Sequence, residues 1–362
     1  MTGPQIHPLR VLVLADAGLG HTERYVGELI RQGCDVAMAS LEVGEYEYLR
    51  LKRRGPFRWL HYPLAIPQLK RAVTAFHPDV INPHFASGYG FLAAMMRSSV
   101  NVPIVLQLLG SDVLIAPQKS WIHRRKVHTA LSAADVVLGD SAYLCDEAEK
   151  VAHLKERNVI PWGIEEKFLT LAETRRAIGA PLKVLVPRPH EPVYNNDFLL
   201  RNLEPLITNN SIALTFPSFG RYSRSFIDRA RDWYGDRIGF YNRKSREKFI
   251  QFMAGFDVYL SASKSDSSPV SLIEAMGLGL VPIVGDIPGV WEWMKPDRGF
   301  LFDLNDPHAL LSALGDLIQG KHDLDRMRQR NLQQVKAHGV FEQNIAATIE
   351  FLRRASEGGR VG

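Results

Sequence analysis

Two acidic residues near the start of a predicted helix in the C-terminal half are the strongest candidates for chemistry. Asp266 lies in a serine-rich loop that follows the predicted strand Asp257–Ser261, and Glu274 lies eight residues later in the predicted helix Pro269–Gly277. A carboxylate accepts hydrogen bonds and donates none, so Glu274 can hold two neighbouring hydroxyls of a ribose. An acid before a helix and a glutamate on a helix are also common structural features, and spacing alone does not separate the two interpretations.

The start of that helix is predicted to bind an anion. Ser268 is a favoured N-cap residue and Pro269 is a favoured first residue of a helix. The backbone N–H groups from Ser268 to Ser271 then have no partner within the helix and suit a phosphate. Carboxylates beside a phosphate need a balancing cation, and Arg188, two residues after the predicted strand Lys183–Val186, is such a cation.

The first half contains a glycine loop that also follows a strand. The predicted strand Arg10–Asp16 leads into Gly18 and Gly20, a spacing that resembles the beginning of a dinucleotide-binding fingerprint. Glu23 occupies the third glycine position, where a side chain opposes close packing of helix on strand, so NAD binding is disfavoured. The two glycines either let backbone N–H groups approach an anionic or hydroxyl-rich ligand or form a tight turn.

Both halves alternate short β-branched segments with longer helical patterns, which is typical of parallel α/β sheets. In the first half, strands are predicted at 10–16, 34–40, 79–83, 103–108 and 135–139, with helices that include 21–32 and 119–133. In the second half, strands are predicted at 183–186, 212–217, 238–241, 257–261 and 281–285, and helices at 245–255, 269–277, 307–318, 324–337 and 342–355. Open α/β sheets bind ligands beyond the carboxyl ends of their strands, so the loops at those ends are the expected site.

The chain is expected to form two domains and a returning helix. Its 362 residues, 46% apolar and 23% charged, fit an ordinary globular protein. The expected division is 1–162, 163–340 and a terminal helix 341–362, with a boundary segment around 158–181. The two cysteines are too few for a disulfide framework or a zinc site. No apolar stretch approaches the roughly 18 residues that span a bilayer, and no signal peptide is apparent, so a cytoplasmic protein is expected.

The excess of basic residues, a formal net charge of +5, is local. Five basic residues between Arg50 and Arg58 alternate with aromatic residues up to Tyr62, and a second basic cluster, 123–126, follows Trp121. Basic and aromatic residues together suit an anionic membrane surface, so peripheral contact through residues 50–62 is expected; a solvated basic surface is the alternative. Nucleic acid is not expected as a partner, because no DNA- or RNA-reading motif accompanies the charge.

The acidic loop and helix resemble the signature of a known family. Residues 265–279, SDSSPVSLIEAMGLG, are similar to the retaining family-4 glycosyltransferases, which have two acids with seven residues between them, a Glu-Ala-Met sequence and a small-residue turn. Segments 83–90, 110–113, 161–168 and 299–310 resemble other passages of the same family in the same order. This resemblance implies the GT-B fold, two Rossmann-like doubly wound α/β domains that face a central cleft, with a C-terminal helix that crosses back to the N-terminal domain.

The resemblance also implies roles for individual residues. Glu274 would hold the nucleotide ribose, Asp266 would face the donor sugar, and Arg188 would neutralise the leaving diphosphate. Further contacts with the donor would come from Gly18, Gly20, Ser267, Ser268, Pro269, Val270 and Ser271. On the acceptor side would lie His21, His84 and Asp112.

Three positions depart from the family pattern. The family pairs its arginine with a lysine about five residues later, where this chain has Val193, so Lys264 is predicted to supply the second cation, with Lys244 as the alternative. Leu109 stands where many relatives have histidine, and Asp266 stands where the family usually has glutamate. Because of these departures, a protein that binds sugar nucleotides or glycans without catalysis is an alternative.

The expected reaction transfers a sugar, with retention of anomeric configuration, from a nucleoside diphosphate sugar to a hydroxyl of a glycan or lipid-linked acceptor. A UDP-sugar is favoured over a GDP-sugar as the donor. No Asp-x-Asp motif lies where it could hold a metal beside a diphosphate, so neither metal nor cofactor is expected. A sugar-nucleotide epimerase is a further alternative, because such enzymes share the two-domain architecture. The expected location is the cytoplasm, at the inner face of the membrane.

Overall fold

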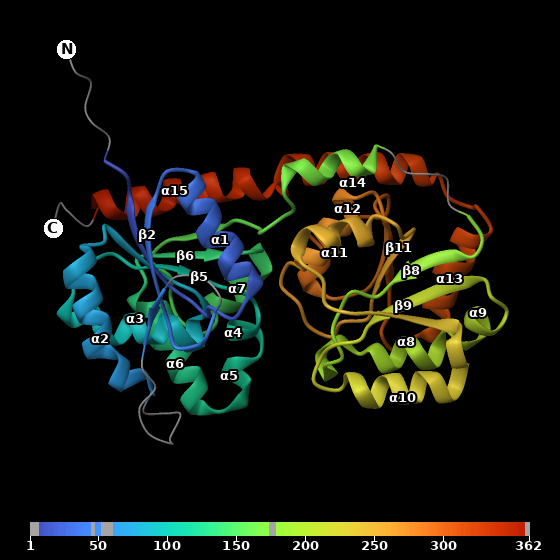
Figure 1. The fold of residues 1–362 in the computed structure, drawn as a ribbon, viewed down its shortest axis with the longest axis horizontal. Coiled ribbons are helices and arrows are strands. Elements are labelled where there is room, and N and C mark those ends of the chain that lie inside the picture. The colour runs from blue at the N-terminus through green and yellow to red at the C-terminus, as the bar shows by residue number, and fades with distance from the viewer. Residues whose placement is uncertain (1–6, 45–47, 52–60, 174–178, 359–362) are drawn as a thin grey trace, which may run out of the picture. The chain divides into compact units, whose positions relative to one another are not determined.

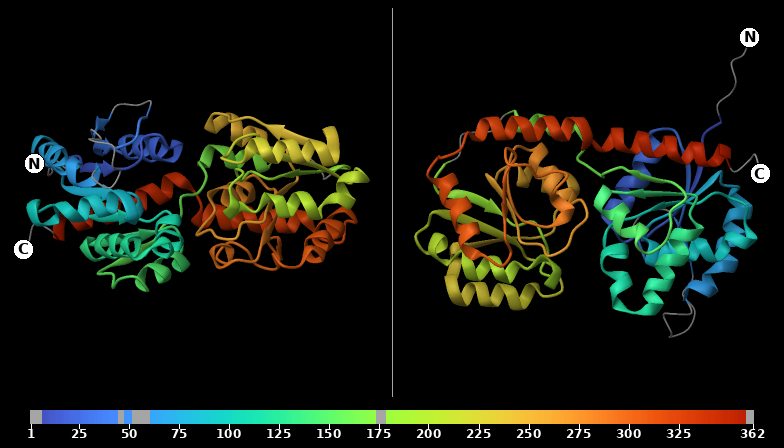
Figure 2. Two further views of the ribbon diagram at one scale, coloured as in Figure 1. Left: turned by 90° about the horizontal axis from the view of Figure 1, so that it is seen from below. Right: turned by 180° about the vertical axis from the view of Figure 1, so that it is seen from behind.

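The computed structural model describes residues 7–44, 48–51, 61–173 and 179–358, which form two compact units (Figure 1). The N-terminal unit comprises Met1–Pro161 and Glu342–Gly362, and the C-terminal unit comprises Trp162–Phe341. Each unit contains parallel β-sheet with helices packed around it, as the further views in Figure 2 also show. This arrangement confirms the predicted α/β class with two doubly wound domains.

The strands of the N-terminal unit form one parallel series. The first four, in spatial order, are β3 (Leu49–Arg50), β2 (Asp35–Ser40), β1 (Arg10–Leu14) and β4 (Val80–Pro83). The remaining three are β5 (Val105–Gln107), β6 (Val136–Gly139) and β7 (Arg157–Val159). Single parallel bridges, Ile81 to Ile104 and His84 to Gln107, join β4 to β5. The direction in which the chain adds strands therefore reverses between β1 and β4.

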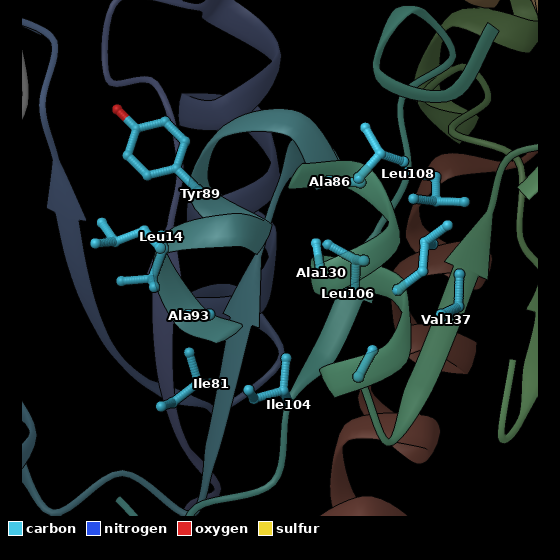
Figure 3. Close-up of a cluster of buried hydrophobic side chains, with 14 of the residues drawn as sticks. Leu14, Ile81, Ala86, Tyr89, Ala93, Ile104, Leu106, Leu108, Ala130 and Val137 are labelled. Carbon is cyan, nitrogen blue, oxygen red and sulfur yellow. The ribbon is translucent and has the colours of Figure 1, made fainter. Parts of the chain in front are cut away.

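The helices of the N-terminal unit pack against its strands and enclose the apolar core. They are α1 (Gly20–Arg31), α2 (His61–Phe76), α3 (Phe91–Met96), α4 (Ser111–Leu114), α5 (Ala116–Lys119), α6 (Trp121–Ala133), α7 (Ala142–Glu149) and α15 (Phe341–Gly358). Figure 3 shows Leu14, Ile81, Leu106 and Val137, from four neighbouring strands, with Ala130 of α6. Strands buried on both faces have the nearly continuous apolar sequences from which they were predicted.

Helix α15 returns from the end of the chain to the N-terminal unit. Asn344 Nδ2 donates to the carbonyl oxygen of Pro161 at 2.8 Å, and Gln32 Nε2 donates to that of Glu342 at 2.8 Å. On the buried side of the helix, Ile345 is 4% exposed and Leu352 is fully buried. The last 21 residues therefore group with the first 161 despite their distance in the sequence.

The C-terminal unit has a single six-stranded parallel sheet. In spatial order its strands are β10 (Ile238–Tyr241), β9 (Ile212–Pro217), β8 (Leu182–Leu185), β11 (Val258–Ser261), β12 (Val281–Gly285) and β13 (Phe300–Phe302). Its helices are α8 (Asn196–Asn202), α9 (Glu204–Thr208), α10 (Ser223–Tyr234), α11 (Arg246–Met253), α12 (Val270–Gly277), α13 (Pro307–Ile318) and α14 (Leu324–His338).

Alternate residues of the central strands β8 and β11 belong to two separate cores. Val184 of β8 and Leu260 of β11 pack with α8, α9, α10 and α13 on one face. Leu185 and Tyr259, their neighbours along the same strands, pack with α11, α12 and α14 on the other face. Because successive side chains of a strand point to opposite faces, this alternation fixes which strand residues lie below which helices.

Most predicted elements lie where the sequence pattern put them, and β9, β10, β12 and α13 have the predicted bounds. Helix α13 begins as expected, because Asp306 Oδ1 accepts from the N–H of His308 at 2.9 Å and Pro307 follows at the first helical position. The boundary segment predicted at 158–181 contains the division between the two units, although its first two residues still belong to β7, which pairs with β6. The short strands β3, β7 and β13 and the helices α8, α9 and α10 were not predicted.

The basic aromatic segment 50–62 lies mostly outside the described residues, which resume at His61 after Leu51. Arg50 ends β3, and Tyr62 lies in the first turn of α2. Within the described ranges, no helix has the length and apolar character needed to cross a bilayer.

Candidate active site

Two loops meet at the point where the strand order of the C-terminal sheet reverses. The chain adds β9 and β10 on one side of β8 and then returns to add β11, β12 and β13 on the other side. Arg188 follows β8, and Asp266 with helix α12 follows β11. Parallel strands end at the same edge of a sheet, so both loops emerge side by side where open α/β sheets bind their ligands.

Arg188 contacts the acidic loop and the helix that follows it. Its guanidinium forms an ion pair with Asp266, and Nη1 donates to Ser271 Oγ at 3.3 Å. The Ser271 hydroxyl also lies 3.0 Å from the Tyr259 hydroxyl, which comes from β11. Burial alone would lower the pKa of Arg188. Nearby negative charge, chiefly that of Asp266 with a smaller effect from Glu274, instead raises the pKa above its ordinary value. Arg188 is therefore a fixed, permanently charged group.

An aromatic ring supports Arg188 on another side. The guanidinium carbon lies 4.3 Å from the centre of the Tyr194 ring, within range of a cation–π interaction. Tyr194 is next to Val193, the position at which the family has a lysine. Where the family has a second cation, this chain therefore has an aromatic residue, Tyr194, which contacts Arg188.

Lys264 lies close to the same segment through its backbone. Its N–H donates to the carbonyl oxygen of Val193 at 2.8 Å, and its side chain is exposed. Lys264 also lines a cavity of about 560 Å³ together with Asn196 of α8 and Arg229 of α10. Lys244, the alternative second cation, is exposed and its Nζ lies 4.9 Å from the centre of the Phe252 ring.

Glu274 is 3% exposed and forms an ion pair with Arg246. Arg246 is the first residue of α11, and its Nη1 donates to Glu274 Oε1. Its other two donors reach Glu165, with Nε 3.1 Å from Oε1 and Nη2 2.7 Å from Oε2. Burial would lower the pKa of Arg246, but the carboxylates of Glu274 and Glu165 raise it above the ordinary value. Three charged groups from distant parts of the chain thus form one cluster.

The predicted cap of helix α12 was wrong by one residue. Helix α12 begins at Val270, with Pro269 as the N-cap residue, so Ser268 is not the cap. The buried Ser268 hydroxyl instead accepts a hydrogen bond from Trp293 Nε1 at 2.9 Å. The N–H groups of Val270 and Ser271 precede the first intrahelical bond, which Leu272 makes to the Pro269 carbonyl. The half-exposed part of the predicted anion-binding region is therefore Val270–Ser271, whereas Ser267 and Ser268 are buried.

A glycine fixes the shape of the acidic loop. A Cβ atom at Gly289 would lie 2.0 Å from the carbonyl oxygen of Asp266. The turn Pro288–Val290 therefore packs directly against the backbone of the loop that carries Asp266. Only glycine permits this distance without displacement of one of the two segments.

In the N-terminal unit, the predicted glycines lie where the strand order reverses. Gly18 and Gly20 follow β1 and are exposed, and the N–H of Gly18 donates to Asp16 Oδ1 at 2.8 Å. Helix α1 begins at Gly20, where an added Cβ would meet nothing within 4 Å. The geometry leaves the backbone at Gly20 accessible to a ligand.

The predicted acceptor-side residues lie near the same edge, but two of them are buried. Asp112 is 1% exposed, and its carboxylate accepts from the N–H groups of Ala86 at 2.7 Å and Leu109 at 3.2 Å. These bonds give Asp112 a structural role in holding the loop after β4. Burial, followed by the nearby His21, lowers the pKa of the fully buried His84 to about 3, so the His84 ring is neutral.

His21 is partly exposed, and its ring centre lies 6.4 Å from that of Phe85. Burial, followed by Arg24, lowers its pKa to about 4, so it is also neutral near pH 7. Of the three acceptor-side residues, His21 is the one that is partly exposed, although its Nε2 atom is buried.

The structure places Arg188 in contact with Asp266 and Ser271, as expected from the sequence. It adds Arg246, Glu165 and Tyr194, which were not predicted as site residues. The basic run 243–246 after β10 was a signal for Arg246. Of that run, only Lys244 was predicted to add a cation to the site.

Among the described residues, no group of three or more histidine, cysteine, aspartate or glutamate side chains is close enough to hold a metal ion. The acids of the sequence Asp323-Leu324-Asp325 have other contacts. Asp323 Oδ1 caps helix α14 by accepting from the N–H of Arg326 at 3.0 Å, and Asp325 pairs with Arg328 at 3.5 Å.

Comparison with known proteins connects these features with a family. The family described as Glycosyl transferase 4-like matches residues 10–141, and the family described as Glycosyl transferases group 1 matches residues 230–334. The TuaC protein of Bacillus subtilis, named as a teichuronic acid biosynthesis glycosyltransferase, is 27% identical over 249 residues. That alignment covers 66% of this chain and 61% of TuaC, so it spans about three fifths of the relative's length.

Solved structures share the fold over almost the whole chain. Sucrose-phosphate synthase from Thermosynechococcus elongatus superposes with a TM-score of 0.78 at 16% identity, over 96% of this chain and 98% of that one. Anabaena HepE in complex with UDP gives a TM-score of 0.78 at 14% identity, over 96% and 100%. Glycosyltransferase families match both halves of the chain in order, and solved glycosyltransferase structures share both domains; the chain therefore has the GT-B fold and is similar to glycosyltransferases in each half.

Proposed function

We propose that this protein transfers a sugar from a UDP-sugar to a hydroxyl acceptor with retention of anomeric configuration, and without a metal ion. The observation that carries the proposal is the joint placement of Arg188, Asp266, Ser271 and Glu274 at the carboxyl ends of β8 and β11. A cation, half-exposed helix N–H groups and a buried carboxylate within one site suit three of the four parts of a nucleoside diphosphate sugar, namely the diphosphate, the sugar and the ribose.

Arg188 and the start of α12 would stabilise the leaving diphosphate. Negative charge grows on the leaving phosphate oxygen as the glycosidic bond breaks, and fixed positive groups stabilise that charge most in the transition state. Arg188 is already held by Asp266, Ser271 and Tyr194, so little reorganisation is required. In this proposal Asp266 faces the donor sugar, and exposed Lys264 adds the second positive charge.

Retention would come from displacement on one face of the sugar. Two-carboxylate chemistry would require a nucleophilic acid beside the anomeric carbon. In the proposed mechanism the departing phosphate oxygen takes the acceptor proton, and the protein orients the two substrates. Gly18, Gly20 and His21 of the N-terminal unit would contribute contacts to the diphosphate and the acceptor.

A UDP-sugar is proposed as donor and a glycan or lipid-linked saccharide as acceptor. Anabaena HepE, which shares the fold, has been solved with UDP and with UDP-glucose. The name of TuaC refers to teichuronic acid biosynthesis, which supports a cell-surface glycan as the product.

Peripheral contact with the inner face of an anionic membrane is also proposed, through residues 50–62 and the exposed start of α6. There, Trp121 is 74% and Ile122 is 48% exposed beside the exposed Arg124 and Arg125. Aromatic side chains next to cations favour the interface of an anionic bilayer. Flotation with anionic liposomes at low salt tests this part, and the absence of co-flotation would dismiss it.

The first experiment is a thermal-shift panel of UDP, GDP and ADP with their sugars. Stabilisation by UDP compounds alone is expected, because a ligand that binds only the folded state raises the unfolding midpoint. Chromatographic detection of UDP release with an added saccharide acceptor then tests transfer. Binding without UDP release would favour the non-catalytic alternative, and an epimerised sugar from the donor alone would favour the epimerase.

Substitution of the two charged residues tests their separate roles. Glu274→Ala is expected to raise KM for the donor by about tenfold to a hundredfold, because it removes bonds made in the ground state as well. Arg188→Ala is expected to lower kcat by about a hundredfold or more, because its interaction grows as charge develops. Initial rates at varied donor concentration measure both, and unchanged rates in both variants would refute the assignment.

A further inference from the structure

Arg246 joins three segments of the C-terminal unit that are far apart in the sequence. It donates to Glu165, 81 residues earlier, and to Glu274, 28 residues later. Its guanidinium uses Nε and Nη2 for the two oxygens of Glu165 and Nη1 for one oxygen of Glu274. A planar guanidinium presents its donors in a rigid fork, so the position of Glu165 sets the direction in which Nη1 points.

The cluster carries two negative charges and one positive charge in a largely buried place. The side chain of Glu274 is 4% exposed, that of Glu165 is 13% exposed and that of Arg246 is 33% exposed. An ionised carboxylate as buried as Glu274 is costly unless a cation compensates it. Arg246 therefore supplies the positive charge that compensates the buried Glu274 carboxylate, and it binds that carboxylate through one oxygen.

The arrangement also leaves part of Glu274 for a ligand. Arg246 bonds only to Oε1, and among the residues that the structure describes Oε2 has no hydrogen-bond partner. A carboxylate oriented by one bond and open at its other oxygen is suited to receive a pair of neighbouring hydroxyls.

We propose that Arg246 is the positioning residue for the ribose end of the donor site, with Glu165 holding Arg246 in place. Arg246 pairs with Glu274 and orients it toward the 2′- and 3′-hydroxyls, without itself contacting the reacting atoms. This inference rests on the proposed function, since it requires a nucleotide at Glu274. A purely structural role, in which the ion pairs only join α11 to α12, is the competing explanation.

The two explanations differ in which part of a nucleotide they affect. If Arg246 positions Glu274, its loss weakens binding only of nucleotides that carry ribose hydroxyls. If it only stabilises the fold, its loss weakens binding of UDP and 2′,3′-dideoxy-UDP to the same extent. Calorimetric titration of both nucleotides into the full-length protein measures this difference.

Arg246→Gln is the principal variant. Its affinity for UDP is expected to fall by about tenfold to thirtyfold, as for the loss of bonds to a charged group, whereas its affinity for 2′,3′-dideoxy-UDP changes by less than about twofold. Arg246→Lys retains the charge without the fork and should weaken UDP binding less. Glu165→Gln leaves Arg246 in place without its anchor and should weaken UDP binding by about threefold to tenfold.

The chain offers a matched control in Arg157, an arginine that also lies between two carboxylates. It is 2.5 Å from Asp146 and 3.4 Å from Glu149 in the N-terminal unit. Arg157→Gln should leave the affinity for both nucleotides unchanged. If Arg246→Gln does not fold, as judged by thermal unfolding, Arg246→Lys and Glu165→Gln carry the same comparison.

Equal weakening of UDP and dideoxy-UDP binding, or no weakening of either, would overturn the role of Arg246. A wild-type protein that binds neither UDP nor any other nucleoside diphosphate would overturn the proposed function instead. Selective loss of UDP binding in the Arg246 and Glu165 variants is the result that supports the inference.

Discussion

At the scale of single residues, the environment of Arg188 differs from that of a simple phosphate-binding cation. It is paired with Asp266, bonded to Ser271 and stacked against Tyr194. Such a group is fixed before the donor arrives, and preorganised charge stabilises a transition state without a further reorganisation cost. We infer that Tyr194 takes over part of the positioning that would otherwise come from a second cation.

Substitution of Tyr194 tests this inference. Tyr194→Leu is expected to lower kcat by about threefold to tenfold, since a cation–π contact contributes roughly 0.5–2 kcal/mol, whereas Tyr194→Phe retains the ring and most of the rate. Steady-state kinetics of UDP release measures the effect. The matched control is Tyr222→Leu, which removes a second tyrosine that lies 5.5 Å from an arginine, Arg221. Equal losses for Tyr194→Leu and Tyr194→Phe would rule out the cation–π contribution.

The buried His84 makes the stability of the N-terminal unit dependent on pH. Burial lowers its pKa from 6.5 to about 3, so below pH 6.5 the unfolded chain binds a proton that the folded chain does not. The stability from neutral His84 is therefore complete above pH 6.5 and is lost as the pH falls toward 3. The expected loss between about pH 7 and pH 5 is about 2 kcal/mol.

Urea denaturation of the wild type and of His84→Gln at the two pH values measures this loss. The variant should show a smaller decrease in the free energy of unfolding between pH 7 and pH 5. His128→Gln, a substitution at an exposed position of α6, is the control and should leave the decrease unchanged. Some decrease is expected to remain from His21, whose pKa is also lowered. A decrease as large in His84→Gln as in the wild type would assign the pH dependence to groups other than His84.

At the scale of elements, the site depends on how closely the turn Pro288–Val290 approaches the acidic loop. The loop is held by Gly289 beneath Asp266 and by the hydrogen bond from Trp293 to Ser268. Both contacts come from the segment after β12, the strand next to β11. The position of Asp266 is therefore set by the segment that follows β12 as well as by its own loop after β11.

Gly289→Ala tests this packing. The added methyl group would meet the Asp266 carbonyl at 2.0 Å, so the loop must shift. We expect the free energy of unfolding to fall by about 1–3 kcal/mol and donor affinity to weaken as well. Gly315→Ala in α13 is the control, because nothing lies within 4 Å of its added Cβ, and it should be neutral or stabilising. Chemical denaturation and UDP titration measure both quantities, and wild-type values for Gly289→Ala would contradict the packing argument.

At the scale of the whole molecule, the chain ends in the unit in which it began. Helix α15 contacts the N-terminal unit through Asn344 and buries Ile345 and Leu352 there. The N-terminal unit is therefore incomplete without helix α15. In the sequence, the C-terminal unit therefore stands between two segments that both belong to the N-terminal unit.

Truncation after Phe341 is expected to destabilise the N-terminal unit selectively. Loss of the buried Ile345 and Leu352 side chains alone removes about 3 kcal/mol or more of apolar burial. Hydrogen exchange should accelerate in peptides from β1 and α1, while peptides from β8 and β11 retain their protection. Glu350→Ala, at an exposed position of α15, is the control that leaves both units unchanged. Uniform acceleration in both units would show that stability is shared across the molecule.

The sequence alone determined the α/β class, most strand positions, the family resemblance and the loop that carries Asp266 and Glu274. These features depend on patterns within a few residues, such as apolar runs of buried strands and the proline at the start of α13. The cap of α12 was assigned wrongly because the Ser268 hydroxyl is taken by Trp293, 25 residues away.

Only the tertiary structure decided which groups surround the candidate site residues. Arg246 meets Glu165 and Glu274 across 81 and 28 residues, and Asp112 is occupied by backbone groups of two separate loops. The order of strands in a sheet determines which distant loops emerge together, and burial then requires each charge to have a partner. Residue type and spacing along the chain do not encode that order, so these partners became visible only in the folded protein.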